Sequence, residues 1–478
     1  MTPHPFYAGP RLGNAHERRR KPTRHVQRTL FRAVKRLLYT IGILLATLSG
    51  IGGANRLEAA PMVPAVPAID LGQVRAAQRE ADRLCAKDGG RMWGVSLCGP
   101  LLFVDAGSKT AASTRPWPVP GARHQDGAWT GPLPPSLGIA NTSFTWHGES
   151  WSMILWPLPK DRFARQALLM HELWHRVQKK IGFPPEGPAN AQLDTVKGRA
   201  LLRLEWRALA VAIESIESEA AKRKSAVKAA LVFRQRRREL FKQAATEERE
   251  LEMHEGLAEY TGFALAARSL AERRRHTLER LQSFDERDSF VRSFAYASGP
   301  AYGLLLDEVA PGWERKAKAS DDLGGLLQGK MEISLPRDLA AATEKAEGEF
   351  DGSKVIAEEE KRATEKRRLV ARLRQSYVTG PRLVLPLHAM HMDFDPNHLQ
   401  PLGKAGTVYR PLTVRDDWGK LVASGGALIA SDWKSVVVPR PDASQENLAG
   451  DGWTLELAPG WRVVAGARAG ELTLSSKN

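Results

Sequence analysis

The sequence predicts an α+β fold: a small antiparallel sheet with several helices, followed by a small all-β domain. Residues 141–157 alternate between apolar and polar side chains directly before a helical stretch at residues 161–180. From Pro381 onward, short alternating runs are separated by glycine, proline and aspartate, which is typical of a β-sandwich or barrel. With 478 residues, the chain is long enough for two or three domains with their own cores.

Residues 1–54 join a basic segment to an apolar run. They contain ten Lys/Arg and one Glu, so +9 of the formal net charge of +16 lies here. Residues 37–54 are apolar and end in small residues, as in a secretory signal, with Ala54 suited to precede the cleavage site. An uncleaved membrane anchor is the alternative, because 18 residues approach the length of a membrane span. We therefore expect export to the periplasm, cell envelope or extracellular space.

The next segment, residues 55–140, contains both cysteines of the chain. Cys85 and Cys98 flank a glycine-rich turn and are expected to form a disulfide in an oxidising compartment, with two reduced, buried cysteines as the alternative. We predict a helix at residues 73–86 and a strand at residues 93–105. Residues 110–135, rich in proline and glycine, are predicted to be an irregular connection.

A catalytic domain is expected at residues 141–335, and its central motif is H-E-x-x-H. Residues 161–180 contain no glycine or proline, and Gly182 with the prolines after it predicts the helix end. On this helix His171 and His175 share one face, so their imidazoles can bind one Zn²⁺. Glu172 lies beside them, where a carboxylate can take a proton from a water molecule.

The best candidate for a third ligand lies in a second helical stretch, residues 252–262 (EMHEGLAEYTG). Glu255 and Glu259 are four residues apart and therefore share a face. Gly256 is small enough to let another helix come close. Either carboxylate could reach the metal on spacing alone.

These two motifs together resemble the gluzincins, the zinc peptidases that include thermolysin and aminopeptidase N. The resemblance covers about residues 141–307. It implies zinc ligands at His171, His175 and Glu255, a general base at Glu172, and a histidine-orienting carboxylate at Glu259. The segment YASGPAYGLLL at residues 296–306 is similar to the family segment whose tyrosine steadies the oxyanion, which implies that role for Tyr296. Ser298 stands where the family usually has lysine.

Two departures from the family are informative. The interval from His175 to Glu255 is much longer than usual, which implies an insertion at about residues 190–246. An apolar stripe in that insertion predicts a long helix or a helical hairpin, and the basic run at residues 234–238 is interpreted as a solvated face. The exopeptidase signature G-x-M-E-N does not precede the first motif, which argues against an enzyme that grips a free α-amine.

Two further segments complete the chain. Residues 336–380 are charged and are predicted to be a helical connector, and residues 381–478 form the all-β domain. Within the latter, His388, His391 and Asp393 have a spacing compatible with a metal site, although strand-edge histidines without cysteines are a weak signal. The chain after residue 54 is only mildly basic, so no specific nucleic-acid partner is expected.

We therefore expect an exported zinc metallopeptidase that acts on a peptide or protein substrate. One alternative is a hydrolase of other amide or ester bonds on the same fold. The other is a cell-envelope binding protein with a structural or vestigial metal site. The presence of Glu172 argues against a vestigial site, because a structural zinc needs ligands and no base.

Overall fold

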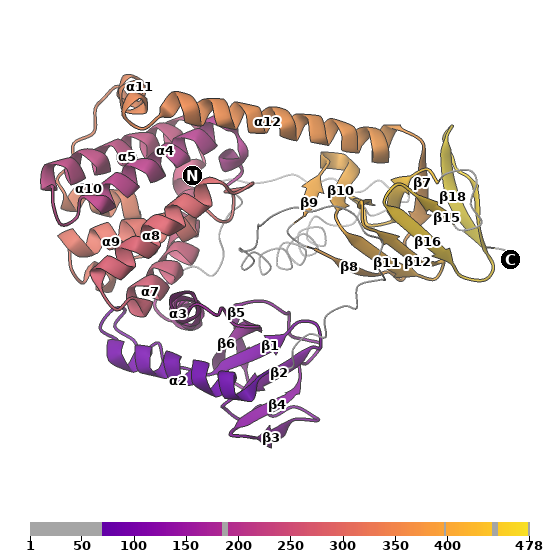
Figure 1. Cartoon of the computed structure of the whole chain (residues 1–478), viewed down its shortest axis with the longest axis horizontal. Helices are drawn as coiled ribbons and strands as arrows, with labels where there is room; N and C mark the ends of the chain where they lie inside the picture. Colours follow the sequence, from indigo (N-terminus) through magenta and orange to yellow (C-terminus); the bar gives the residue numbers. More distant parts are fainter. Residues whose placement is uncertain (1–68, 184–189, 396–397, 442–447, 477–478) are drawn as a thin grey trace, which may run out of the picture. The chain divides into compact units, whose positions relative to one another are not determined.

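The computed structural model describes residues 69–183, 190–395, 398–441 and 448–476, so the predicted signal or anchor lies outside the described residues. The chain is a mixed α+β protein with an all-β C-terminal region (Figure 1). In the part of the chain that the structure describes, no helix is long and apolar enough to cross a membrane.

The N-terminal region consists of one helix and a sheet. Helix α2 (Leu71–Asp88) begins at Asp70, whose side chain accepts a hydrogen bond from the Gln73 amide, and ends at Gly89 in a left-handed conformation. The strands are β1 (Leu101–Asp105), β2 (Thr110–Ser113), β3 (Arg123–Gln125), β4 (Ala128–Pro132), β5 (Thr142–Trp146) and β6 (Glu149–Trp156). Their order across the sheet is β3-β4-β2-β1-β6-β5. Cys85 at the end of α2 is bonded to Cys98, which confirms the predicted disulfide.

The sheet corrects three predictions. It is mixed rather than antiparallel, because β1 pairs with β6 in parallel. The stretch predicted as irregular, residues 110–135, contains β2, β3 and β4. These strands have only three to five residues, so the prolines and glycines of the turns between them dominate the local pattern. The strand predicted at residues 93–105 begins only at Leu101, directly after Pro100, which has no amide hydrogen to donate to a sheet.

Strands β5 and β6 form a hairpin with a turn at His147-Gly148. Both turn residues have positive φ, 46° and 82°, as a tight hairpin turn requires. One face of the sheet, including Phe103 and Ile154, joins the main core beneath the helices. The other face buries Trp151 and Met153 in a separate aromatic cluster with Trp117. Trp146 packs beside this cluster, so Trp146 and Trp151 are core side chains of the sheet.

Helices make up the middle of the chain. Helix α3 (Arg162–Gln178) carries the H-E-x-x-H motif, and α7 (Leu257–Ala266) packs along it. The other α-helices of this region are α4 (Val196–Glu214), α5 (Ala220–Leu240), α6 (Ala244–Leu251), α8 (Leu270–Asp285), α9 (Ala295–Val309), α10 (Leu323–Lys330), α11 (Leu339–Glu349) and α12 (Gly352–Arg374). Shorter helical segments are η1 (Ala191–Asp194), the π-turn η2 (Glu252–Gly256), η3 (Trp313–Arg315) and η4 (Gln375–Thr379).

The insertion is a helical hairpin made of α4 and α5 (Figure 1). Its predicted apolar stripe is buried from Leu202 to Ile216, where the chain turns, and Ala220 is exposed. The interpretation of residues 234–238 as a solvated face is wrong, because Arg234 and Arg237 are fully buried.

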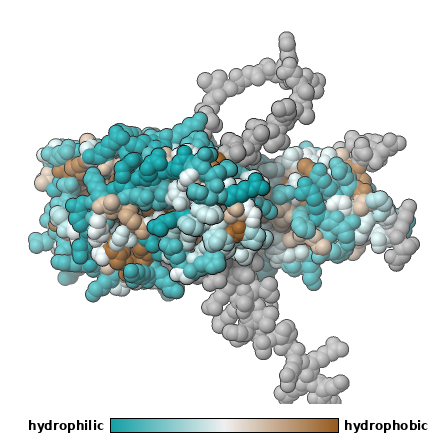
Figure 2. Space-filling model, turned by 90° about the horizontal axis from the view of Figure 1, so that it is seen from below, coloured by the Kyte–Doolittle hydropathy of each residue, from teal (hydrophilic) through white to brown (hydrophobic). Residues whose placement is uncertain are grey.

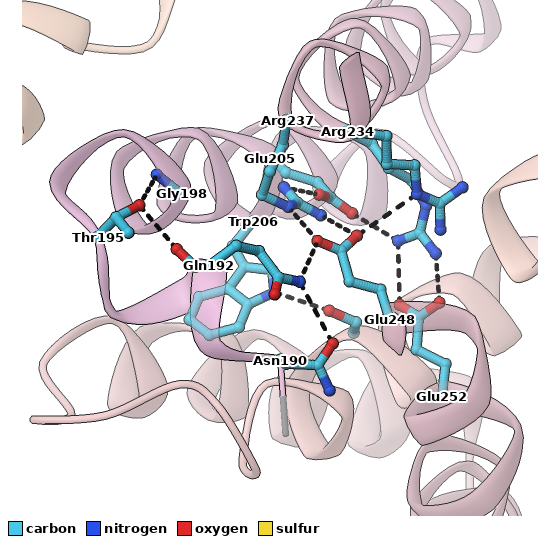
Figure 3. Close-up of polar contacts among 12 residues, drawn as sticks. Asn190, Gln192, Thr195, Gly198, Glu205, Trp206, Arg234, Arg237, Glu248 and Glu252 are labelled. Carbon is cyan, nitrogen blue, oxygen red and sulfur yellow. Dashed lines mark hydrogen bonds and ion pairs between the residues drawn. The ribbon is translucent and has the colours of Figure 1, made fainter. Parts of the chain in front are cut away.

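A buried ion-pair network surrounds these two arginines (Figure 3). Arg237 pairs with Glu205 of α4 and Glu248 of α6, each at 2.7 Å. Arg234 pairs with Glu205 at 3.0 Å and also with Glu252 of η2. A buried arginine is tolerated only when carboxylates compensate its charge. These acids are distant in the sequence, so a reading of the basic run alone could not find them.

The predicted connector is helical, but its first half belongs to the core of the helical region. Val355 and Glu359 of α12 are buried. Glu359 pairs with Arg199 and Arg203 of α4 at 2.7 and 3.1 Å.

The C-terminal region is a two-sheet sandwich. Its strands are β7 (Arg382–Pro386), β8 (His391–Phe394), β9 (Leu399–Pro401), β10 (Gly406–Tyr409), β11 (Leu412–Asp416), β12 (Gly419–Ala423), β13 (Ala427–Ala430), β14 (Ser435–Pro439), β15 (Leu448–Gly450), β16 (Trp453–Leu457), β17 (Trp461–Ala465) and β18 (Glu471–Ser476), with the short turn η5 (Gly403–Ala405). One sheet has the order β17-β18-β7-β14-β13-β10-β9 and the other β15-β16-β12-β11-β8. Both contribute side chains to a separate core that includes Trp418 and Trp453.

The surface offers few large apolar side chains. On the face shown in Figure 2, hydrophilic residues predominate and apolar residues occur in small, separate groups. The weak histidine pattern of the β-region does not assemble into one site. Asp393 pairs with Arg415, whereas His388 pairs with Asp417, and these side chains are exposed.

Candidate metal centre

Helix α3 presents His171 and His175 on one face. Its first turn is capped by Asp161, which accepts a hydrogen bond from the Ala164 amide at 2.7 Å. Leu169 and Leu173 bury the neighbouring face in the core, which fixes the rotation of the helix. From the sheet, Ser152 donates to the Glu172 carbonyl at 2.7 Å. The two imidazoles consequently meet, with their Nε2 atoms 3.0 Å apart.

Glu255 completes a group of three donors. It lies in the π-turn η2, and its Oε2 is 3.5 Å from His171 Nε2 and 3.4 Å from His175 Nε2. Ligand atoms bound tetrahedrally to zinc at about 2.0–2.1 Å are about 3.3 Å apart. The three donor atoms, separated by 3.0–3.5 Å, therefore fit three corners of such a tetrahedron without rearrangement.

Both histidines are oriented through their other ring nitrogen. Glu259 Oε2 lies 2.8 Å from His171 Nδ1, and Gln178 Oε1 lies 2.7 Å from His175 Nδ1. Because these oxygens accept hydrogen bonds, each Nδ1 carries a proton, so a neutral imidazole held in this way turns its Nε2 lone pair toward the donor group. Glu259 is itself held by Arg280 of α8 at 2.5 Å. The sequence reading included Glu259 and missed Gln178, which is three residues after His175 on the same helical face.

The charges around the two imidazoles favour a cation between them. Burial alone would lower the pKa of His171, but its hydrogen bonds to Glu255 and Glu259 raise this pKa to about 10. Burial would raise the pKa of Glu255, yet the neighbouring histidines hold it well below its usual range. The site thus stabilises positive charge at the point where the three donors converge.

Glu172 has the environment of a proton acceptor. Its side chain is 1% exposed, and neither carboxylate oxygen has a hydrogen-bond partner within the described residues. Burial raises the pKa of Glu172. Its Oε1 is 4.0 Å from His171 Nε2, beside the donor group. A buried carboxylate without a partner is costly, which indicates that it interacts with something bound at the site.

Tyr296 of α9 borders the other side of His171. The two rings are stacked, with centroids 5.7 Å apart. The Tyr296 hydroxyl donates a short hydrogen bond to Glu255 Oε2, the oxygen that faces the histidines. In this structure Tyr296 therefore contacts the candidate ligand carboxylate. Burial and Glu255 raise the pKa of Tyr296 well above its usual range, so it remains a donor.

Two glycines allow the helices of the site to approach each other. A Cβ on Gly299 of α9 would lie 2.2 Å from the Gly256 carbonyl oxygen, and one on Gly262 of α7 would lie 2.5 Å from the Ala167 carbonyl oxygen of α3. Ser298 accepts a hydrogen bond from Trp206 of the insertion at 2.9 Å. Ser298 thus has a structural partner in the helical hairpin.

The insertion reaches the site through η2. Glu252, at the start of this π-turn, pairs with the buried Arg234, while Glu255, near its end, faces the histidines. Figure 3 shows how Arg234 and Arg237 bring Glu205, Glu248 and Glu252 together from three helical segments. The insertion therefore helps to fix the backbone that carries Glu255.

Comparisons with models of protein families, with curated proteins and with solved structures found no match for this chain. The chemistry of the site must be argued from the geometry of its own residues.

Proposed function

We propose that the chain is a zinc-dependent hydrolase that cleaves peptide bonds. The observation that carries this proposal is the combination of His171, His175 and Glu255 at tetrahedral spacing with the unpartnered carboxylate of Glu172 beside them. A structural zinc site needs four protein ligands and no base. Within the described residues this donor group has three members, which leaves one position for a small molecule.

Each residue has a role that its surroundings support. When bound, Zn²⁺ would lower the pKa of a water molecule and polarise a carbonyl group. Glu172 would take the proton from that water as it attacks and pass it to the leaving amine. Glu259 and Gln178 would keep the two imidazoles in the required tautomer. Tyr296, released from Glu255, would donate a hydrogen bond from its hydroxyl to the oxyanion.

The sheet supports a peptide as the substrate. β5 is an edge strand of the N-terminal sheet and contacts α3. An extended peptide can add to an exposed sheet edge by main-chain hydrogen bonds, which would bring it beside the H-E-x-x-H helix. This favours a peptidase over a hydrolase of other amide or ester bonds. Export, with residues 37–54 as a signal or an anchor, remains part of the proposal.

The test is Glu172→Gln in the zinc-loaded chain, assayed against a peptide library. The amide keeps the size of the side chain and cannot accept the proton, so turnover should fall by at least about 10²-fold. Zinc content should stay at one per chain, because Glu172 is not among the three donors. Equal turnover of the variant and the wild type would exclude the proposed mechanism.

A further inference from the structure

His254, next to Glu255 in η2, has no role in the function proposed above. Its ring centroid lies 5.1 Å from that of His175, and its side chain is 12% exposed. Within the described residues, its Nδ1 is buried and has no hydrogen-bond partner. Glu255 Oε1 is 3.3 Å from Nδ1, without the geometry of a hydrogen bond.

Three simpler roles do not explain this histidine. As packing against His175 alone it would be a poor choice, because a buried nitrogen without a partner costs about 1–3 kcal/mol. It is not a fourth ligand, since it does not belong to the group of donor atoms that lie within 4.8 Å of one another. Its contact with Glu255 is an ion-pair contact at 3.3 Å without hydrogen-bond geometry, so it leaves the hydrogen-bonding capacity of Nδ1 unused.

The backbone explains how His254 comes to the site. A π-turn adds a residue to the helical register, and such turns are frequent at functional sites. In η2 it lets Glu252 stay in the buried ion-pair network while both His254 and Glu255 lie beside the histidines of α3. Tyr296 borders His171, and His254 borders His175, so the two candidate ligands each have one polar aromatic neighbour.

We propose that His254 contacts the substrate, forming a hydrogen bond to the main-chain amide or carbonyl beside the scissile bond. This inference rests on the proposed function, because it needs a substrate at the metal. It assigns to His254 a hydrogen-bond partner that the described residues do not supply. The substrate class is therefore one with a polar main chain next to the reacting carbonyl, as in a peptide.

The experiment uses the full chain loaded with Co²⁺ in place of Zn²⁺. The visible spectrum of bound Co²⁺ reports the metal's ligands without any need for turnover. The probe is acetohydroxamate, which binds the metal through its two oxygens and presents its N–H to neighbouring groups. His254→Phe keeps a ring against His175 and removes both nitrogens, whereas His254→Asn keeps a donor and an acceptor. The matched control is His391→Phe, at an exposed histidine of β8.

We expect the Co²⁺ spectrum before addition of the probe to be the same in all four proteins. The Kd of acetohydroxamate should rise at least tenfold in His254→Phe, recover in part in His254→Asn and stay unchanged in His391→Phe. An unchanged Kd in His254→Phe would overturn the inference, and so would an altered spectrum, which would mean that His254 positions Glu255. If the wild-type chain itself bound no Co²⁺ at this site, the proposed function would fail first.

Discussion

At the scale of single residues, the feature that most favours metal binding is the fixed orientation of the two histidine side chains. Each Nδ1 faces an oxygen acceptor, Glu259 for His171 and Gln178 for His175, so both Nε2 lone pairs point at the same volume. Imidazoles free to rotate would lose that convergence and with it most of the metal affinity. The geometry therefore distinguishes residues that would bind metal from residues that would orient its ligands.

The roles of Glu255 and Glu259 can be separated by zinc affinity. Glu255→Ala would leave two histidines, too few to fix Zn²⁺, so we expect loss of stable zinc binding. Glu259→Ala would remove the acceptor of His171 Nδ1 and leave the three donors in place, so affinity should fall about 10–100-fold. A competition titration with a zinc chelator measures the zinc affinity of both variants. The control is Glu279→Ala, which removes an exposed ion pair with Arg275 and should leave zinc affinity unchanged. The reverse ranking would exchange the two assignments.

Sequence spacing could identify residues that helical periodicity brings together, but it could not identify contacts between different helices. His171, Glu172 and His175 lie within one turn and a half of a helix, and Glu255 with Glu259 lies on one face of another. Gln178 could have been identified by the same helical spacing, but it is uncharged and belongs to no motif. Arg280 reaches Glu259 from α8, a contact that only the folded chain creates.

At the scale of elements, close helix packing fixes the third donor. η2 crosses α9 where Gly256 meets Gly299, and no side chain fits between them. The sequence indicated that Gly256 permits a close approach, but its partner could not be named, because the crossing point depends on tertiary structure. Strands β2, β3 and β4 could not be predicted for the same reason, because they are held as strands by pairing with one another and with β1 rather than indicated by their own sequence pattern.

Gly299→Ala should disturb this crossing. Its methyl group would overlap the Gly256 carbonyl oxygen, so we expect the free energy of unfolding to fall by about 1–3 kcal/mol. Zinc affinity should fall as well, since η2 carries Glu255. Gly348→Ala in α11 is the control, because a Cβ there meets no atom within 4 Å and alanine favours helix, so stability should stay equal or rise. Equal urea midpoints for Gly299→Ala and wild type would show that the helices can separate freely.

The ion-pair network of the insertion provides a second test of element packing. Arg234→Gln would leave Glu252 buried without its cation, while Glu205 would keep only Arg237, and this should cost about 3–5 kcal/mol of unfolding free energy. Arg236→Gln, on the same helix, removes only a partly exposed pair with Glu239 and should change stability by less than about 1 kcal/mol. Chemical unfolding of both variants measures the difference. Similar losses would mean that the network is not a tightly compensated one.

At the scale of the whole molecule, patterning predicted the α+β class, the β-rich C-terminus and the helical character of residues 190–246, whereas their being an insertion was inferred from the long interval between the two motifs. Patterning could not show that α12 belongs to the helical core, because a charged helix has the same sequence pattern whether its charges are exposed to solvent or paired with other charges. The first half of α12 holds Glu359 against Arg199 and Arg203 of α4, whereas its end packs on the β-sandwich through Leu373. One helix thus contributes to two cores, and a composition change at Pro381 does not mark where the second core begins.

This arrangement predicts different stabilities for two C-terminal fragments. Leu373 and Tyr377 are each 5% exposed and cover Leu402, Val408 and other side chains of one sheet. The Tyr377 hydroxyl also donates to the Gly426 carbonyl at 3.0 Å. A fragment of residues 369–478 retains this cover, whereas a fragment of residues 381–478 exposes the apolar surface beneath it. Loss of two buried side chains should cost the shorter fragment about 3–5 kcal/mol.

Urea unfolding followed by tryptophan fluorescence would compare the two fragments, because Trp418 and Trp453 lie in the core between the sheets and report its opening directly. Tyr377→Phe in the longer fragment is the intermediate case, since it removes one hydrogen bond and keeps the ring, and should cost about 1 kcal/mol. Equal midpoints for the two fragments would place the end of α12 outside the β-domain. If neither fragment unfolded cooperatively, the sandwich would depend on the helical region for its stability, and residues 369–478 would not be a separate folding unit.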